Sequence, residues 1–173
     1  QQDDAPRGIT FQPGIYAVVE DVLKEVPGSV LDVGAGEGYL SRRLAQGGRD
    51  VTACDFLEDN FRCPEIPFAK ADLNGRFPFA DDTFDAAVSV EVIEHIENHV
   101  SFVRELLRVV KPGGTVIMTT PNVLSLSSRW YYFLYGFTDC APRPLDPSRE
   151  AYWMQHINPI SLPELLFLVE RFG

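Results

Sequence analysis

A glycine-rich segment, Val30 to Tyr39, has the strongest potential for chemistry in this sequence. It reads VLDVGAGEGY, an apolar run followed by Gly34, Gly36 and Gly38 and then by residues typical of a helix. Glycines let a ligand approach the backbone closely, and the unpaired N–H groups of a helix N-terminus bind anionic groups. The dinucleotide-binding pattern Gly-x-Gly-x-x-Gly needs its third glycine one place later, where this chain has Tyr39. The spacing therefore disfavours NAD.

Two aspartates follow the next two apolar runs along the chain. Asp55 comes after Val51–Cys54, about where a carboxylate would bind ribose hydroxyls, and Asp72 comes after Phe68–Ala71, placed to reach an adenine edge. Asp is common in the turns that follow strands, so each aspartate alone has a structural explanation. Ligands bind at the carboxyl edge of open α/β sheets, however. A glycine turn and two carboxylates at three successive strand ends therefore predict one ligand site.

A cluster of two carboxylates and an imidazole occurs in the sequence Glu91-Val92-Ile93-Glu94-His95. If one helical turn forms there, Glu91, Glu94 and His95 share a face at positions i, i+3 and i+4. One interpretation is a His–carboxylate pair at the rim of a substrate pocket, since acids also favour helix starts. The other is a divalent-metal site with oxygen and nitrogen ligands, for which His156 offers a fourth ligand. All four side chains should then lie close together.

An aromatic run, Trp130 to Phe137, forms a third feature and is preceded by Arg129. Aromatic side chains can line an apolar substrate pocket or lie at a membrane interface. We expect most of these side chains simply to pack over the sheet.

Short apolar runs alternate with helical stretches in the rest of the chain. The spacing predicts strands over 29–33, 51–54, 68–71, 85–90 and 115–119, and helices over 12–26, 39–45, 100–110 and from 161 onward. This alternation predicts an α/β fold with a doubly wound parallel sheet covered by helices on both faces. We expect a single domain over residues 1–173, with residues 1–10 as a loose arm and residues 122–160 as an insertion.

The composition is that of an ordinary globular protein, with 45% hydrophobic and 23% charged residues among 173. The formal net charge of -10 is a poor electrostatic match to nucleic acid, so we do not expect RNA or DNA as a partner. Cys54, Cys63 and Cys140 include no CxxC pair, which favours a reducing, cytoplasmic location over a disulfide scaffold. The sequence has no run of 18 apolar residues, so we expect no transmembrane segment.

Four stretches of the sequence resemble the class I S-adenosylmethionine-dependent methyltransferases: LDVGAGEGYL, TACDF, KADLNGRFPFADDTFDAAVSVEVIEH and LLRVVKPGGTVIMTTPN. The resemblance implies a Rossmann-like sheet with strand order 3-2-1-4-5, S-adenosylmethionine as cofactor, and a substrate cover in the 122–160 insertion. The cofactor-binding residues that it implies are Asp32, Gly34, Gly36, Gly38, Asp55, Phe56, Asp72 and Leu73.

The same resemblance implies an incomplete sheet. Members of the family normally add two more strands after a helix like Ser161–Phe172, and these have no counterpart before Gly173. We therefore expect five parallel strands with residues 115–119 at an exposed edge, which would favour a homo-oligomer.

The Glu-x-x-Glu-His cluster with its later histidine is similar to two subgroups of this family. One comprises metal-dependent 2′-O-methyltransferases that act on RNA, and the other comprises ubiquinone-biosynthesis O-methyltransferases. We expect methyl transfer to an oxygen atom of a small or lipid-linked acceptor, with His95 as the base beside Glu91 and Glu94. Glu91, Glu94, His95 and His156 would hold a divalent ion such as Mg²⁺ or Mn²⁺ that lowers the pKa of a coordinated hydroxyl. The alternatives are an RNA 2′-O-methyltransferase and a cofactor-binding domain without catalytic activity.

Overall fold

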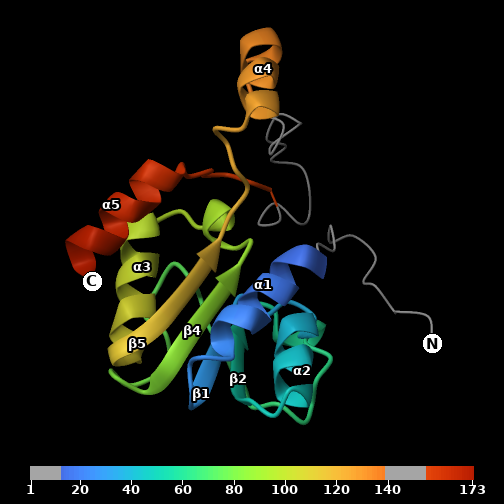
Figure 1. Ribbon diagram of the computed structural model, residues 1–173, viewed down its shortest axis with the longest axis vertical. Helices are drawn as coiled ribbons and strands as arrows, with labels where there is room; N and C mark the ends of the chain where they lie inside the picture. Colours follow the sequence, from blue (N-terminus) through green and yellow to red (C-terminus); the bar gives the residue numbers. More distant parts are fainter. Residues whose placement is uncertain (1–12, 139–154) are drawn as a thin grey trace, which may run out of the picture.

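Five parallel strands form a single sheet in the order β3-β2-β1-β4-β5 in the computed structural model, which describes residues 13–138 and 155–173 (Figure 1). The predicted strand order is therefore confirmed. The strands are β1 (Ser29–Val33), β2 (Asp50–Asp55), β3 (Phe68–Lys70), β4 (Phe84–Val90) and β5 (Val110–Thr119). Within the described residues no further strand pairs with the outer side of β5. The predicted arm, residues 1–10, lies outside the described residues, as does the 139–154 part of the insertion.

Helices cover both faces of this sheet (Figure 1). They are α1 (Pro13–Leu23), α2 (Tyr39–Gln46), α3 (His99–Val109), α4 (Leu126–Tyr135) and α5 (Leu162–Phe172), with short 3-10 turns η1 (Glu58–Asn60) and η2 (Ile93–His95). Successive side chains of a strand point to opposite faces. Val30 of β1 thus packs with residues of α1 and α2, and Leu31 packs with residues of α3 and α5. None of the described helices is long and apolar enough to cross a membrane.

The last strand is longer than its apolar run predicts. The Lys-Pro-Gly-Gly segment that follows α3 belongs to β5, and the pairing of β4 with β5 shifts register between Phe84 and Ala86. Gly114 lies at this irregularity, where an added Cβ would approach the carbonyl oxygen of Asp85 to 2.7 Å. The Asp85 carboxylate accepts hydrogen bonds from Lys111 Nζ at 2.8 Å and from the Ser29 backbone N–H at 2.8 Å. Side-chain contacts thus join β1, β4 and β5 at the amino end of the sheet.

Helix α4 differs most from the sequence-based expectation. It stands apart from the sheet and its covering helices (Figure 1), and its aromatic side chains are exposed, from 41% for Tyr131 to 77% for Phe133. The prediction that most of these aromatics pack over the sheet is therefore wrong. The reason is geometric, because the chain continues beyond the carboxyl end of β5 before the helix begins, and only Ser128 of this helix is buried.

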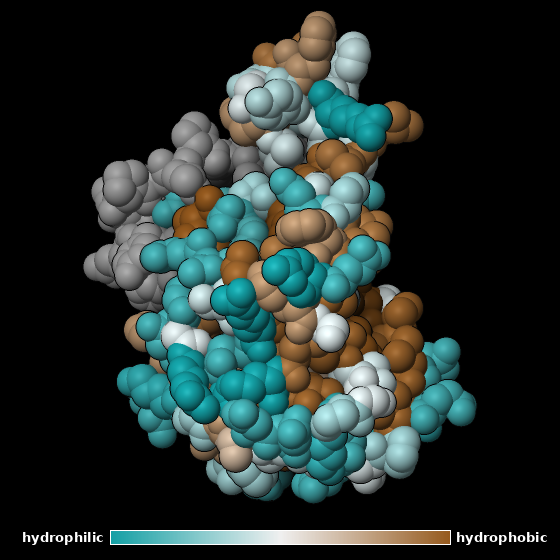
Figure 2. Space-filling view, turned by 90° about the vertical axis from the view of Figure 1, so that its left-hand side faces the viewer, coloured by the Kyte–Doolittle hydropathy of each residue, from teal (hydrophilic) through white to brown (hydrophobic). Residues whose placement is uncertain are grey.

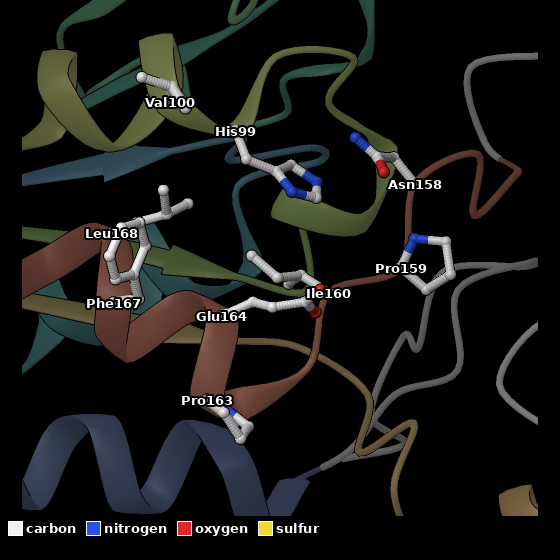
Figure 3. A pocket seen from close by; sticks show the side chains of 9 residues that line it. All are labelled: His99, Val100, Asn158, Pro159, Ile160, Pro163, Glu164, Phe167 and Leu168. Carbon is white, nitrogen blue, oxygen red and sulfur yellow. The ribbon is translucent and has the colours of Figure 1, made fainter.

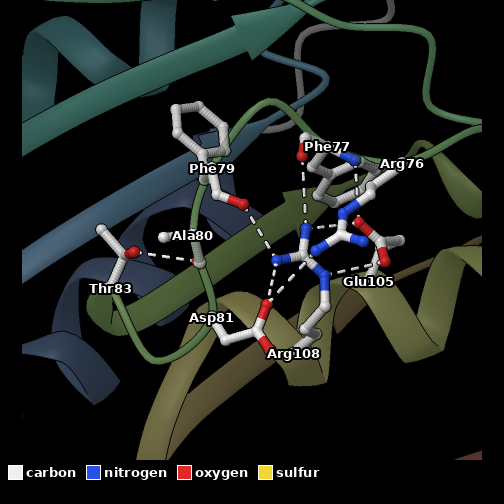
Figure 4. Close-up of polar contacts among 8 residues, drawn as sticks. All are labelled: Arg76, Phe77, Phe79, Ala80, Asp81, Thr83, Glu105 and Arg108. Atoms are coloured by element: carbon white, nitrogen blue, oxygen red, sulfur yellow. Dashed lines mark hydrogen bonds and ion pairs between the residues drawn. The ribbon is translucent and has the colours of Figure 1, made fainter.

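A partly buried arginine, Arg108, connects the loop before β4 to helix α3 (Figure 4). Arg108 donates to the carbonyl oxygens of Phe77 and Phe79 at 3.2 and 2.9 Å and to the Asp81 carboxylate at 2.7 Å. It also makes two hydrogen bonds to Glu105, at 2.6 and 2.9 Å, and these two side chains are only 17% and 15% exposed. Such bidentate, desolvated pairs contribute more to stability than exposed pairs.

We expect Arg108→Met to lower the free energy of unfolding by about 2–4 kcal/mol, because the substitution leaves two carbonyl groups without their Arg108 donor and the partly buried Glu105 carboxylate without its cation. Urea unfolding followed by circular dichroism measures the change. The control is Lys24→Met, which removes an ion pair to Asp21 in which both side chains are more than 70% exposed. Equal stabilities for the two variants would contradict the assignment of Arg108 as a structural clamp.

Candidate active site

The glycine turn after β1 combines packing constraints with open space. Gly34, Gly36 and Gly38 all have positive φ, at 76°, 55° and 85°. An added Cβ would lie 2.4 Å from Val92 at Gly34 and 2.7 Å from Phe61 at Gly38, whereas at Gly36 it would meet no atom within 4 Å. The first and third glycines are therefore required by contacts within the protein. Gly36 has room in front of its backbone for a ligand.

The two predicted aspartates lie at the carboxyl ends of β2 and β3, as the strand pairing requires. The Asp55 carboxylate accepts hydrogen bonds from the Gly36 N–H at 2.9 Å and from the Leu57 N–H at 3.0 Å. Asp72 is exposed and accepts from the Asn74 N–H at 3.0 Å. A half-buried and an exposed carboxylate thus border the glycine turn and can accept hydrogen bonds from hydroxyl or amino groups of a ligand.

The two apolar residues of the predicted cofactor site differ in position. Phe56 is 50% exposed directly after β2, so its ring is available to a ligand. Leu73 is only 8% exposed and belongs to the hydrophobic core between the sheet and helices α3 and α5. Leu73 can therefore face a ligand only through a small part of its surface.

Asp32 is a buried carboxylate behind the turn. It is 3% exposed and accepts a hydrogen bond of 2.5 Å from the Ser41 hydroxyl of α2. Burial raises its pKa to about 6, and the charge of Asp55 adds to this effect, while the Ser41 hydrogen bond opposes it. A cationic ligand group near Asp32 would lower this pKa again.

Tyr16 of α1 is a site residue that the sequence analysis missed. Its ring lies 5.3 Å from the ring of Tyr39, the first residue after the glycine turn. Burial raises the pKa of its phenol, and the negative charges of Asp32 and Glu91 raise it further. Tyr16 therefore lies near the ends of both β1 and β4. Its only signal in the sequence was its place in an amphipathic helix, which is equally typical of a core residue.

Three of the four expected metal ligands come together beyond β4. One ligand atom each from Glu94, His95 and His156 lies within 4.8 Å of the other two. Glu94 is 1% exposed, and its Oε2 accepts from Thr120 at 3.1 Å, whereas the buried Oε1 has no hydrogen-bond partner and lies 4.0 Å from His156 Nε2. Burial raises the pKa of Glu94. A buried carboxylate oxygen that lacks a partner is suited to receive a cation.

The return of His156 to this cluster depends on Asn158. The Asn158 N–H donates to the Glu94 carbonyl at 3.0 Å, and its side-chain amide donates to the carbonyls of Ile96 and Glu97 at 3.2 Å each. His95 Nδ1 lies 3.0 Å from the Gln155 carbonyl oxygen, and the His95 and His156 rings are 4.9 Å apart. The segment 155–158 is therefore held against the η2 turn by backbone groups on both sides.

Helix α5 follows directly and anchors the segment. Its start has the predicted capping box of Ser161 and Glu164, and Leu165 and Val169 pack into the core. Leu166, however, is 50% exposed, so only part of the expected apolar face is buried.

Glu91 does not join this group of ligands. The expected helical turn is a 3-10 turn that begins only at Ile93, and Glu91 itself has a left-handed φ of 55°. Its carboxylate accepts a hydrogen bond of 2.9 Å from the Thr119 hydroxyl of β5. Burial raises the pKa of Glu91, and the charge of Glu94 adds to the effect. The structure thus places Glu91 near the cluster, on the β5 side, and reduces the expected four-ligand set to three.

A separate open pocket of about 450 Å³ lies between the N-terminal ends of α3 and α5 (Figure 3). It is lined by His99, Asn158 and Glu164 together with apolar side chains. Burial lowers the pKa of His99. None of the predicted site residues lines this pocket, so it is not part of the candidate site.

Comparison with known proteins agrees with this geometry. The family profile described as "Methyltransferase domain" matches residues 31–118, which include the glycine turn, both aspartates and the Glu94–His95 pair. The chain belongs to the methyltransferase family. A relative from Mycolicibacterium smegmatis, 29% identical over 141 residues, is named as an S-adenosylmethionine-dependent methyltransferase, and S-adenosylmethionine is the cofactor that this family implies.

Individual relatives support the same assignment. A demethylmenaquinone methyltransferase from Beutenbergia cavernae is 33% identical over 141 residues, which cover 76% of this chain and 58% of that protein. A ubiquinone biosynthesis O-methyltransferase from Rickettsia typhi is 36% identical over 100 residues, which cover 54% of this chain and 41% of that protein. The chain thus spans about half the length of these two relatives. An S-adenosylmethionine-dependent methyltransferase from Mesorhizobium loti shares the fold, with a TM-score of 0.67 at 17% identity over 91% of this chain and 79% of that one.

The residues present in this methyltransferase fit S-adenosylmethionine. The open space at Gly36 leaves room for a ligand against the backbone, and Asp55 and Asp72 offer carboxylate acceptors to its hydroxyl and amino groups at two successive strand ends. The carboxylates of Asp32, Asp55 and Glu91 also surround the turn with negative charge, which suits a cationic sulfonium ligand.

We expect Gly36→Val to weaken binding of S-adenosylhomocysteine roughly tenfold or more, because its side chain enters the open space that the ligand needs. The matched control is Gly48→Val, where φ is also positive, at 83°, and the space is equally open, but the position lies outside the site. Calorimetric titration measures binding, and thermal unfolding checks that the two variants carry similar backbone strain. If the two variants bind S-adenosylhomocysteine with equal affinity, the glycine turn is not part of the cofactor site.

Asp32 should make stability depend on pH. Its pKa in the folded state, about 6, exceeds the ordinary value of 3.8, so its stabilising contribution is present below about pH 4 and is lost as the pH rises through 6. Asp32→Asn stays uncharged and can still accept from Ser41. The free energy of unfolding of Asp32→Asn, relative to that of the wild type, should therefore increase by about 3 kcal/mol as the pH rises from 4 to 7. Urea unfolding at several pH values tests this, and the same trend in the exposed variant Asp50→Asn would refute it.

Proposed function

We propose that this methyltransferase transfers a methyl group from S-adenosylmethionine to an oxygen atom of a small or lipid-linked acceptor. The observation that carries the proposal is the group of Glu94, His95 and His156 beside the glycine turn. The two are adjacent because Val92, between Glu91 and the η2 turn, closes against Gly34. Two relatives, a demethylmenaquinone methyltransferase and a ubiquinone biosynthesis O-methyltransferase, favour a quinone-type acceptor, and the second favours oxygen as the methylated atom.

His95 is the base in this proposal. A carbonyl oxygen can only accept a hydrogen bond, so the contact of Nδ1 with the Gln155 carbonyl requires the proton on Nδ1 in the neutral ring. Nε2 is then the basic nitrogen. When bound, S-adenosylmethionine supplies an electrophilic methyl group, and the reaction is an in-line displacement. The acceptor oxygen would bond to that methyl carbon as the S–C bond breaks and S-adenosylhomocysteine leaves with its electron pair, and the oxygen would give its proton to Nε2 of His95.

A divalent ion is the alternative to this base, since a His95 nitrogen that binds an ion cannot also take the proton. Glu94, His95 and His156 would hold it through one carboxylate and two imidazoles, a donor set that suits Mn²⁺ better than Mg²⁺. The unpartnered oxygen of Glu94 is the observation that favours it. Such an ion would lower the pKa of an acceptor hydroxyl. Glu91 lies outside the ligand group and would act by keeping negative charge near the cationic donor.

The experiment also distinguishes two alternative functions. An RNA 2′-O-methyltransferase is favoured by the same carboxylate–histidine group but disfavoured by the net charge of -10. A cofactor-binding domain without turnover would bind the cofactor and methylate nothing. A cytoplasmic location, expected from the cysteines, also remains a proposal.

The test measures formation of S-adenosylhomocysteine by the purified protein with catechol and with an RNA oligonucleotide as acceptors. We expect methylation of catechol, and we expect His95→Gln and His156→Gln to lower kcat by about 100-fold or more while cofactor affinity changes less than about twofold. The control is Lys24→Gln, at a side chain that is 71% exposed and pairs with Asp21. After removal of metal with EDTA, Mn²⁺ should bind to the wild type and not to Glu94→Gln.

The outcomes separate the hypotheses. Faster methylation of the RNA would favour the nucleic-acid alternative, and cofactor binding without any methylation would favour the non-catalytic one. Wild-type activity in His95→Gln would exclude His95 as the base. If His95→Gln and His156→Gln lose activity but the wild type does not bind Mn²⁺, the result would favour the mechanism in which His95 is the base and no metal takes part.

A further inference from the structure

Helix α4 presents a large apolar surface that nothing in the described structure covers. Trp130 is 63% exposed, Phe133 77% and Tyr135 60%, and Leu126 at the start of the helix is 85% exposed. Exposed apolar surface of this size on one short element marks an interaction site. Figure 2 shows the α4 end at the top of the molecule mostly in brown and pale colours, while teal is more frequent on the body below.

The exposed side chains lie on every side of the helix. Trp130, Tyr131, Tyr132 and Phe133 are consecutive, so at 100° per residue they cover the whole circumference, and each is at least 41% exposed. A protein partner that packs against one helix face would leave the other faces in water. A lipid interface surrounds an inserted helix, and tryptophan and tyrosine are the residues that prefer it.

The charge pattern agrees with a lipid surface. The chain contains 25 acidic residues, yet none falls between Glu105 and Asp139, and Arg129 is the only charged residue of α4. The acidic body would be repelled by anionic lipid, whereas helix α4 carries a single positive charge and no negative one. At 1.5 Å per residue, a helix of 10 residues is about 15 Å long, too short to span a bilayer core of about 30 Å. It would therefore lie in the interface.

The position of α4 connects this surface with the candidate active site. The helix follows β5, whose Thr119 contacts Glu91, and Thr120 just beyond it contacts Glu94. Figure 1 shows α4 beyond the carboxyl ends of β4 and β5, the ends at which the acidic and histidine residues gather. A lipid surface bound to α4 would thus lie on the side of the molecule where the acceptor must enter.

We propose that α4 inserts its aromatic side chains into the interfacial layer of a lipid bilayer and so holds the active-site edge toward the membrane. Binding of α4 to lipid does not depend on the proposed function. The conclusion that the acceptor is lipid-linked rather than water-soluble rests on the proposed function. The occupant of the α4 surface is therefore lipid, not a protein partner or a second copy of the chain.

The test is flotation of the full-length protein on a density gradient with vesicles of phosphatidylcholine containing a minority of phosphatidylglycerol. We expect the wild type to float, and the double variant Trp130→Ser with Phe133→Ser to lose vesicle affinity roughly tenfold or more, since this stacked pair supplies two of the exposed rings. The matched control makes the same kind of change on α5, Leu166→Ser with Phe167→Ser, at side chains that are 50% and 64% exposed. It should float like the wild type.

Three results would overturn the proposal. These are a wild type that stays at the bottom of the gradient, an α4 variant that floats as well as the wild type, and an α5 variant that loses as much affinity as the α4 variant. A lipid-free dimer that disappears only in the α4 variant would instead identify a contact between copies of the chain.

Methylation of catechol without vesicles is measured in parallel. Flotation without methylation would contradict the proposed function and leave lipid binding intact, and methylation without flotation would do the reverse.

Discussion

The close contact between Gly34 and Val92 joins the two halves of the site. Any side chain at position 34 would overlap Val92, since an added Cβ would lie 2.4 Å from one of its methyl groups. On one side of this contact the glycine turn continues to Gly36 and the carboxylate of Asp55. On the other side the chain continues to Glu94 and His95. Protein interiors do not tolerate such overlap. Because Gly34 has no Cβ atom, Val92 can pack against its backbone, and this contact keeps the glycine turn close to Glu94 and His95.

The features that were predictable from sequence depend on short stretches of chain. The apolar run of β1, the three glycines and the aspartate that ends β2 each carry their signal locally, and the parallel order of the strands then brings them to one edge. The capping box at Ser161 was readable for the same reason. Helical periodicity alone could not show that the turn after Glu91 is a 3-10 turn, because Glu91 has a left-handed backbone and is hydrogen-bonded to Thr119 of another strand, which local spacing does not indicate.

Other features depend on contacts between distant residues, which a single sequence does not show. Tyr16 reaches the site because α1 packs beside Tyr39, and the exposure of α4 follows from where the chain leaves β5. An aromatic run has the same composition whether it is buried or exposed, so the sequence could not distinguish the two. The histidine at position 156 was found from its residue type, but the backbone hydrogen bonds of Asn158 that hold it in place had no sequence signal.

The attachment of residues 155–158 has a consequence for the order of folding. The cofactor half of the site is built from chain segments close in sequence, whereas the Asn158 amide that binds Glu94 is separated from it by the whole of α3, β5 and α4. Contacts of long sequence separation form late, because closing a long loop costs entropy. A chain emerging from the ribosome can therefore form the surroundings of its glycine turn before the Gln155 carbonyl that orients His95, and the side chain of His156, are in place. Maturation would proceed from a cofactor binder to an enzyme, and the last step would be the docking of this short C-terminal segment.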